Sequence, residues 1–153
     1  MAKGSSYAGQ MLRILLNASA IPNVADNAAV SPLTQVAVAL HTADPSSGPQ
    51  NTNEVVYANY LRVLTTRSSA ANGWVVTDGS TVVAASASPT AVVTFAQCTS
   101  AGSSTTVITH FSVGQSTVLT SGKIFYSGTV TPNVTLGQNV SPQLTTGSSV
   151  TET

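Results

Sequence analysis

The segment "TVTPNVTLG", residues 129–137, gives the clearest indication of the fold. Its apolar residues Val130, Pro132, Val134 and Leu136 alternate with Thr or Asn, which is the period of a strand with one buried face. The next segment, "NVSPQLTTG" at 139–147, repeats the scheme. Because proline cannot donate a hydrogen bond to a neighbouring strand, we expect Pro132 and Pro142 at a sheet edge or a bulge.

The rest of the chain after residue 32 also has the pattern of short strands separated by turns. Alternation is clear at 33–42 and 105–114, and we expect further strands at the ranges 54–66, 73–78, 80–86, 91–97 and 123–128. Turn-forming stretches rich in Gly, Asn, Asp and Ser lie between them. Eight or nine short strands at such spacing predict a single all-β domain, an antiparallel sandwich or barrel, over 33–153.

The first 32 residues differ from this pattern and predict a helix followed by a linker arm. Residues 5–18 place Ser6, Gln10, Arg13 and Asn17 on one stripe and the apolar residues Tyr7, Met11, Ile14, Leu15 and Ala18 on the other side. Two readings stay open for this helix. It packs on its own sheet, or it docks on a neighbouring subunit as a helix in a groove.

The composition favours a structural subunit over a nucleic-acid or membrane protein. Only 7% of the 153 residues are charged, the net charge is zero and the mean hydropathy is +0.22. A neutral surface repels other copies weakly, which suits a fixed assembly. The five Lys and Arg residues are scattered, so no basic footprint for nucleic acid exists, and no apolar run approaches the ~18 residues that span a bilayer.

Residues able to carry out chemistry are few and dispersed, so we expect no enzyme. Cys98 is the only cysteine, His41 and His110 are the only histidines, and no spacing pairs the carboxylates Asp26, Asp44, Glu54 and Asp78. No phosphate loop or zinc motif occurs. We therefore expect no catalytic residues, no metal site and no cofactor. Trp74, the only tryptophan, is interpreted as core or edge cover and not as a sugar-stacking platform.

Charge is concentrated around one loop, in "LHTADPSSGPQNTNEVVYANYLRV", residues 40–63. We interpret Glu54 and Arg62 as a structural clasp that holds this loop. A regular strand over 54–66 would place both on one side, and a bulge around 58–59 would change that phase. His41 and Asp44 are interpreted as turn-stabilising residues.

Four short segments occur in a fixed order: "LHTADP" (40–45), "NEV" (53–55) with "YLR" (60–62), and "ITHFSVG" (108–114). Their order and spacing, over about residues 8–145, resemble a family of small virion proteins of tailed bacteriophages. Members are often labelled tail-fibre-like, and others resemble capsid cement, or decoration, proteins with a jelly-roll β-sandwich. The family's pattern has Gly before the tyrosine and Ala after it, where this chain has Asn59 and Leu61.

The resemblance implies an all-β, jelly-roll-like sandwich with an N-terminal helix, located on the outer capsid surface of the virion. The implied function is to cement the shell by bridging subunits of the major capsid protein, with copies of the chain itself, as dimer or trimer, as further partners. A tail, neck or fibre component that touches a receptor is the alternative. The expected inter-subunit contacts are the helix residues Tyr7, Met11 and Leu15 and the 43–53 loop residues Asp44, Pro45 and Asn53.

Overall fold

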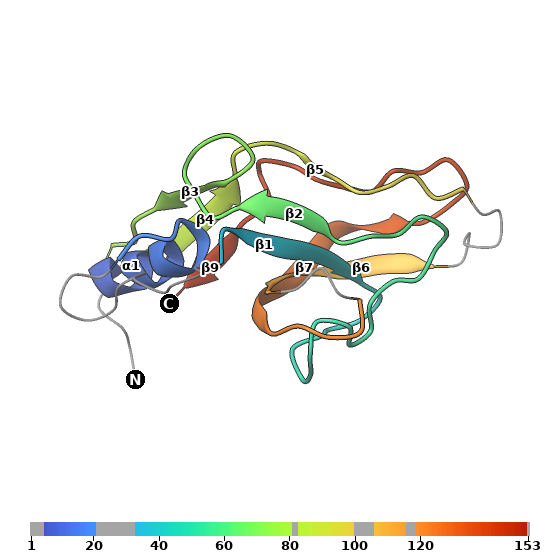
Figure 1. Cartoon of the computed structure of the whole chain (residues 1–153), viewed down its shortest axis with the longest axis horizontal. Coiled ribbons are helices and arrows are strands. Elements are labelled where there is room, and N and C mark those ends of the chain that lie inside the picture. The colour runs from blue at the N-terminus through green and yellow to red at the C-terminus, as the bar shows by residue number, and fades with distance from the viewer. Residues whose placement is uncertain (1–4, 21–32, 81–82, 100–105, 116–118, 153) are drawn as a thin grey trace. The chain divides into compact units, whose positions relative to one another are not determined.

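The computed structural model describes residues 5–20, 33–80, 83–99, 106–115 and 119–152, with side chains from Ala8 onward. These ranges contain one helix and nine strands (Figure 1). They are α1 (Ser5–Leu16), β1 (Gln35–His41), β2 (Val63–Thr66), β3 (Trp74–Thr77), β4 (Ala85–Pro89), β5 (Val93–Thr94), β6 (Val107–Gly114), β7 (Ile124–Thr135), β8 (Gln143–Leu144) and β9 (Val150–Glu152). The predicted fold class is confirmed: a sandwich-like, antiparallel all-β protein with an N-terminal helix.

The chain divides into two compact units, each assembled from separate stretches of sequence. Unit 1 comprises Met1–Gln35, Thr65–Val92 and Thr145–Thr153, and unit 2 comprises Val36–Leu64 and Val93–Leu144. The predicted boundary between an arm and a β domain near residue 32 lies outside the described residues and stays a prediction. No helix in the described part of the chain is long and apolar enough to cross a membrane.

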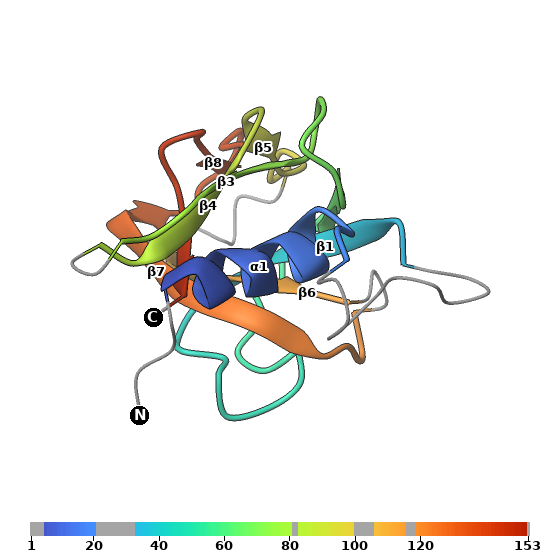
Figure 2. The same cartoon turned by 90° about the vertical axis from the view of Figure 1, so that its left-hand side faces the viewer.

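In unit 1 the helix packs on a three-stranded sheet of order β3-β4-β9 (Figure 2). Its buried face consists of Ala8, Leu12 and Leu16, spaced four apart so that they line up on one side. The strands contribute Trp74, Ala85 and other small or apolar side chains to the same core. Of the two readings left open for the helix, the structure therefore shows packing on the chain's own sheet.

Arg67 forms hydrogen bonds with the carboxyl end of this helix. Its guanidinium donates hydrogen bonds to the carbonyl oxygens of Ile14 and Leu15, which have no partner inside the helix, and to that of Leu33. A cation at this end also interacts favourably with the helix dipole. Burial lowers the pKa of Arg67, yet an arginine stays charged at neutral pH.

Unit 2 is built on a four-stranded sheet of order β2-β1-β6-β7. Strand β1 lies between two neighbours and is buried on both faces from Val36 to His41. It pairs with β6 in the register Val38↔Val113 and Leu40↔Phe111. Strand β7 is the terminal strand, and a register shift between Ile108 and His110 divides its pairing with β6 into two parts. A two-stranded sheet, β5-β8, completes the unit.

Several predicted strand boundaries were wrong. In the expected strand 54–66 only β2 at its end is extended, because turns occupy most of the preceding residues. The expected strand 80–86 begins later, as β4, and the expected strands 123–128 and 129–137 form the single strand β7. Pro132 lies on this edge strand within the shifted register, as predicted, but its side chain is exposed, so the inward position expected for it was wrong.

Candidate functional site

The loop between β1 and β2, residues 42–62, is closed at its base by backbone pairing. His41 and Glu54 form an isolated antiparallel bridge, Thr42 N–H donates to the Asn53 carbonyl at 2.9 Å, and Val55 N–H donates to the Leu40 carbonyl at 3.0 Å. Glu54 and its partners are thereby brought back against the end of β1. The predicted continuous strand is replaced by this returning loop.

The expected clasp residues lie in contact inside this loop. Arg62 donates through Nε to Glu54 Oε1 at 2.8 Å and through Nη2 to Oε2 at 2.7 Å, a bidentate ion pair. The Arg62 side chain is 0% exposed and that of Glu54 6% exposed. Tyr60 donates its hydroxyl to Glu54 Oε1 at 2.8 Å, and Arg62 Nη1 donates to the Ser121 carbonyl at 2.8 Å. Because a buried charge is costly unless it is paired, these contacts fix both side chains.

A second buried polar group, Gln50, His41 and Ser112, continues this cluster toward the sheet. The Thr52 carbonyl lies 2.9 Å from His41 Nδ1 and can only accept, so Nδ1 carries the proton and Nε2 accepts from the Ser112 hydroxyl at 2.8 Å. Gln50 Nε2 in turn donates to the Ala37 carbonyl at 2.8 Å. Burial lowers the pKa of His41, which favours this neutral imidazole.

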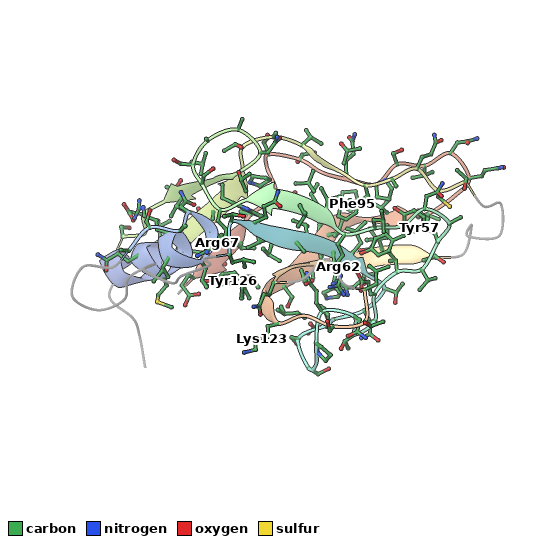
Figure 3. The ribbon with its side chains drawn as sticks, viewed as in Figure 1. Tyr57, Arg62, Arg67, Phe95, Lys123 and Tyr126 are labelled. Carbon is green, nitrogen blue, oxygen red and sulfur yellow. The ribbon has the colours of Figure 1, made fainter. Side chains whose placement is uncertain are left out.

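Aromatic side chains lie next to the buried ion pair, and Figure 3 labels two of them, Tyr57 and Phe95, together with Arg62. Tyr60 stacks on Phe95 with ring centroids 6.3 Å apart, and Tyr57 is tilted against Tyr60 at 5.2 Å. The Tyr57 hydroxyl donates to the Ala96 carbonyl at 2.9 Å, and burial raises the pKa of Tyr57 to about 12. The phenol of Tyr60 is also raised in pKa by burial, so both rings stay protonated and act as packing groups.

Over this rigid interior the loop presents apolar side chains to solvent. Val56 is 86% exposed and Leu61 is 64% exposed, and a hollow of about 230 Å³ lies beside Val56. Its lining includes Val56, Tyr57 and Leu119. We call the exposed apolar residues Val56 and Leu61 of this loop, together with the exposed Leu119 between β6 and β7, the apolar loop surface. Such residues on a fixed backbone are suited to contact another protein.

The six residues expected to contact other subunits differ in burial. Asp44 and Asn53 are exposed on the loop, but they also stabilise it: Asp44 Oδ1 accepts from Ser46 N–H and Asn53 Nδ2 donates to the Asp44 carbonyl, both at 2.9 Å. Pro45 is buried. Met11 and Leu15 are half-buried at the border of the helix's packed face, and the side chain of Tyr7 lies outside the described residues.

The sequence interpretation missed Gln50, Tyr60, Val56 and Leu61. Nothing marks Gln50 in the polar run "PQNTN", because its burial depends on the loop folding back over β1. Residues 54–66 were expected to form one strand, which would make Val56 and Leu61 strand residues. Within the described residues, no group of three His, Cys, Asp or Glu side chains is placed to hold a metal.

The substitution of Asn59 for the glycine of the resembled pattern has a structural explanation. Asn59 has a φ of 71°, in the left-handed region that glycine adopts freely and asparagine tolerates better than most residues. Its Nδ2 also donates to the Thr99 hydroxyl at 3.3 Å. The turn before Tyr60 is therefore compatible with either residue.

The fold and the site place the chain in the class of sandwich-like β proteins that present a fixed loop over a buried polar cluster. The model of the Gp80 family, described as podophage GP4 fiber I protein gp80, matches residues 14–151. The chain belongs to this family, and its role is that of a structural protein of the phage virion. No curated protein matches the chain.

Proposed function

We propose that the chain decorates and cements the outer capsid surface by bridging neighbouring subunits of the major capsid protein. The observation that carries this proposal is the apolar loop surface. Val56 and Leu61 are largely exposed, yet their backbone is anchored on both sides by the buried pair of Glu54 and Arg62. A contact surface that is already ordered avoids much of the entropic cost of binding.

The charge distribution agrees with permanent attachment to a lattice. The net charge is zero, and residues 55–61, which include Val56 and Leu61, contain no Lys, Arg, Asp or Glu. A standard interface buries about 1,600 Å². Binding only to the assembled shell would stabilise that state by linkage, repeated at every attachment point. The proposed function requires no catalytic residue and no cofactor.

A tail, neck or fibre component is the second candidate, and membership of a family described as a fiber protein is compatible with a virion structural role of either kind. The two candidates differ in copy number and place. A cement subunit follows the symmetry of the coat and occurs over the whole shell, whereas a tail or fibre subunit occurs in few copies at one vertex. The absence of a fixed-period repeat in the sequence favours cement over a fibre shaft.

The proposal is tested by binding the purified chain to capsids that lack it. We expect Val56→Asp and Leu61→Asp to weaken binding strongly, because each places a charge in the interface and removes apolar burial worth roughly 1.5–3 kcal/mol when complete. Val75→Asp is the matched control, because Val75 is also exposed but lies on β3 in unit 1. Equal binding of all three variants and the wild type would refute a role for the apolar loop surface.

A further inference from the structure

Strand β7 is a long terminal strand with an open side. It extends over Ile124–Thr135, and in the described part of the chain β6 is its only paired neighbour. Figure 2 shows it as the long orange arrow below β1 and β6. Its residues are half-buried or exposed throughout, in contrast to the fully buried β1. A terminal strand offers backbone donors and acceptors to any chain that can align with it.

The half of this strand that contains Pro132 is the better protected against such pairing. Pro132 has no backbone N–H, and the register shift against Ile108 and His110 distorts the ladder in the same region. The other half, residues 124–130 or "IFYSGTV", pairs with β6 at Ile124 and over Tyr126–Thr129, and it contains neither proline nor charge. Natural proteins commonly protect exposed edges with lysine, proline or a bulge. A second register shift, between Val113 and Gly114, lies at the start of this half, but the central residues Tyr126–Thr129 pair with β6 in regular register and contain no lysine, proline or bulge.

We propose that residues 124–130 pair antiparallel with the same residues of a second copy of this chain. An isologous pair has a two-fold axis, which for a window of these residues passes through Ser127. The small Ser127 side chains then face each other. Tyr126 lies opposite Gly128, Phe125 opposite Thr129, and Ile124 opposite Val130.

These cross-strand partners are of the kinds that stabilise sheets. An aromatic ring covers a glycine at Tyr126 and Gly128, and Phe125 with Thr129 joins an aromatic to a β-branched side chain. No like charges meet anywhere in the window, and the zero net charge of the chain adds little repulsion between copies. The segment therefore pairs well with an antiparallel copy of itself, which favours a second copy of the chain over a different extended partner.

The surroundings of the window leave space for a second copy. An open hollow of about 590 Å³ lies along the start of the strand, lined by Ile124, Phe125, Tyr126 and Ser127 together with Ser46, Gly48 and Pro49. Side chains of a paired strand would be accommodated in this space. The proposed contact depends on β7 alone, so it is independent of where in the virion the chain sits.

The test uses sedimentation velocity of the full chain over a broad concentration range. We expect the wild type to show a reversible monomer–dimer equilibrium. Ser127→Asp and Ser127→Lys each place two like charges across the axis, and each should weaken dimerisation at least about fivefold, or about 1 kcal/mol. An equal mixture of the two variants should restore the dimer, because opposite charges then face each other. Thr135→Asp, an exposed position on the same strand beyond Pro132, is the matched control and should dimerise like the wild type.

Hydrogen exchange of the wild type provides a second readout that needs no variant. The amides of 124–130 should gain protection as the dimer forms, while those of β9 in unit 1 should not change. A wild type that stays monomeric, a Ser127→Asp variant as dimeric as the control, or a mixture that does not recover would each overturn the proposal. A monomeric wild type whose Ser127→Asp variant loses attachment to the shell would show that the strand pairs with a coat protein and not with a second copy.

Discussion

Replacing Glu54 by glutamine tests whether the buried ion pair holds unit 2 together. The substitution keeps the shape of the side chain but removes its charge, and its new NH₂ group faces the Nε or Nη2 donor of Arg62. The acceptors that Arg62, which is 0% exposed, would retain include the Ser121 carbonyl at 2.8 Å, with longer contacts to Gln50 Oε1 at 3.4 Å and to the Leu119 carbonyl at 3.5 Å. Removing one partner of a buried pair typically costs about 3–5 kcal/mol, a large part of the ~5–15 kcal/mol that stabilises a domain.

The assay must report on unit 2, because the single tryptophan, Trp74, lies in unit 1. Hydrogen exchange at the amides of β1 and β6 is suitable, since these strands form the centre of the four-stranded sheet. We expect Glu54→Gln to lower the opening free energy there by about 3–5 kcal/mol. The double variant Glu54→Leu with Arg62→Met should recover much of this loss, because it leaves no charge buried.

Asp78→Asn is the control, followed by amide exchange of β3 in unit 1, where both partners lie, because it breaks the other ion pair that the described residues contain. Arg13 and Asp78 are also joined by two hydrogen bonds, but the Asp78 side chain is 55% exposed, and solvent screens the pair. An exposed pair contributes about 0–1 kcal/mol. The reasoning would be refuted if Glu54→Gln destabilised the protein no more than Asp78→Asn does.

Three further perturbations test other parts of the structure. The stability of unit 2 should fall as the pH drops below 6.5, the usual pKa of histidine, because burial lowers the pKa of His41 and the unfolded chain therefore binds a proton first. Hydrogen exchange measures this fall in stability. In the His41→Gln variant the fall should be smaller by about 1.4 kcal/mol for each pH unit below 6.5. Arg67→Leu removes the donors to the Ile14 and Leu15 carbonyls and should cost roughly 1–3 kcal/mol, visible as faster amide exchange in α1, whereas no loss would argue against the clamp. Leu12→Ala should cost about 2–5 kcal/mol in unit 1, followed by Trp74 fluorescence during urea unfolding, and a loss below 1 kcal/mol would contradict its burial.

The sequence predicted those parts of the fold that depend on local periodicity. Strands β1 and β6 were found because each retains its pattern over several residues, and the helix was found from its polar stripe. The face that the helix buries was assigned less well. Leu12 and Leu16 are the buried residues, whereas Met11 and Leu15 lie at the border, because both sides of "MLRILL" are apolar and only the sheet selects between them.

The candidate site could be predicted only in part, because it depends on contacts distant in sequence. Glu54 and Arg62 were noticed as rare charges on either side of a loop, and the structure brings them together. Gln50 and Ser112 could not be found, since their roles arise where the loop meets β6, more than 60 residues away in the chain. The exposure of Val56 likewise follows from the turns that occupy the region where a continuous strand was expected.

A cryo-electron-microscopy reconstruction of the mature particle, with this subunit located in the density, is the most direct test of the cement function. The proposal predicts copies over the whole outer shell, with the apolar loop surface of Val56, Leu61 and Leu119 in contact with coat subunits. Density for the subunit confined to the tail vertex, or its absence from the mature particle, would contradict it.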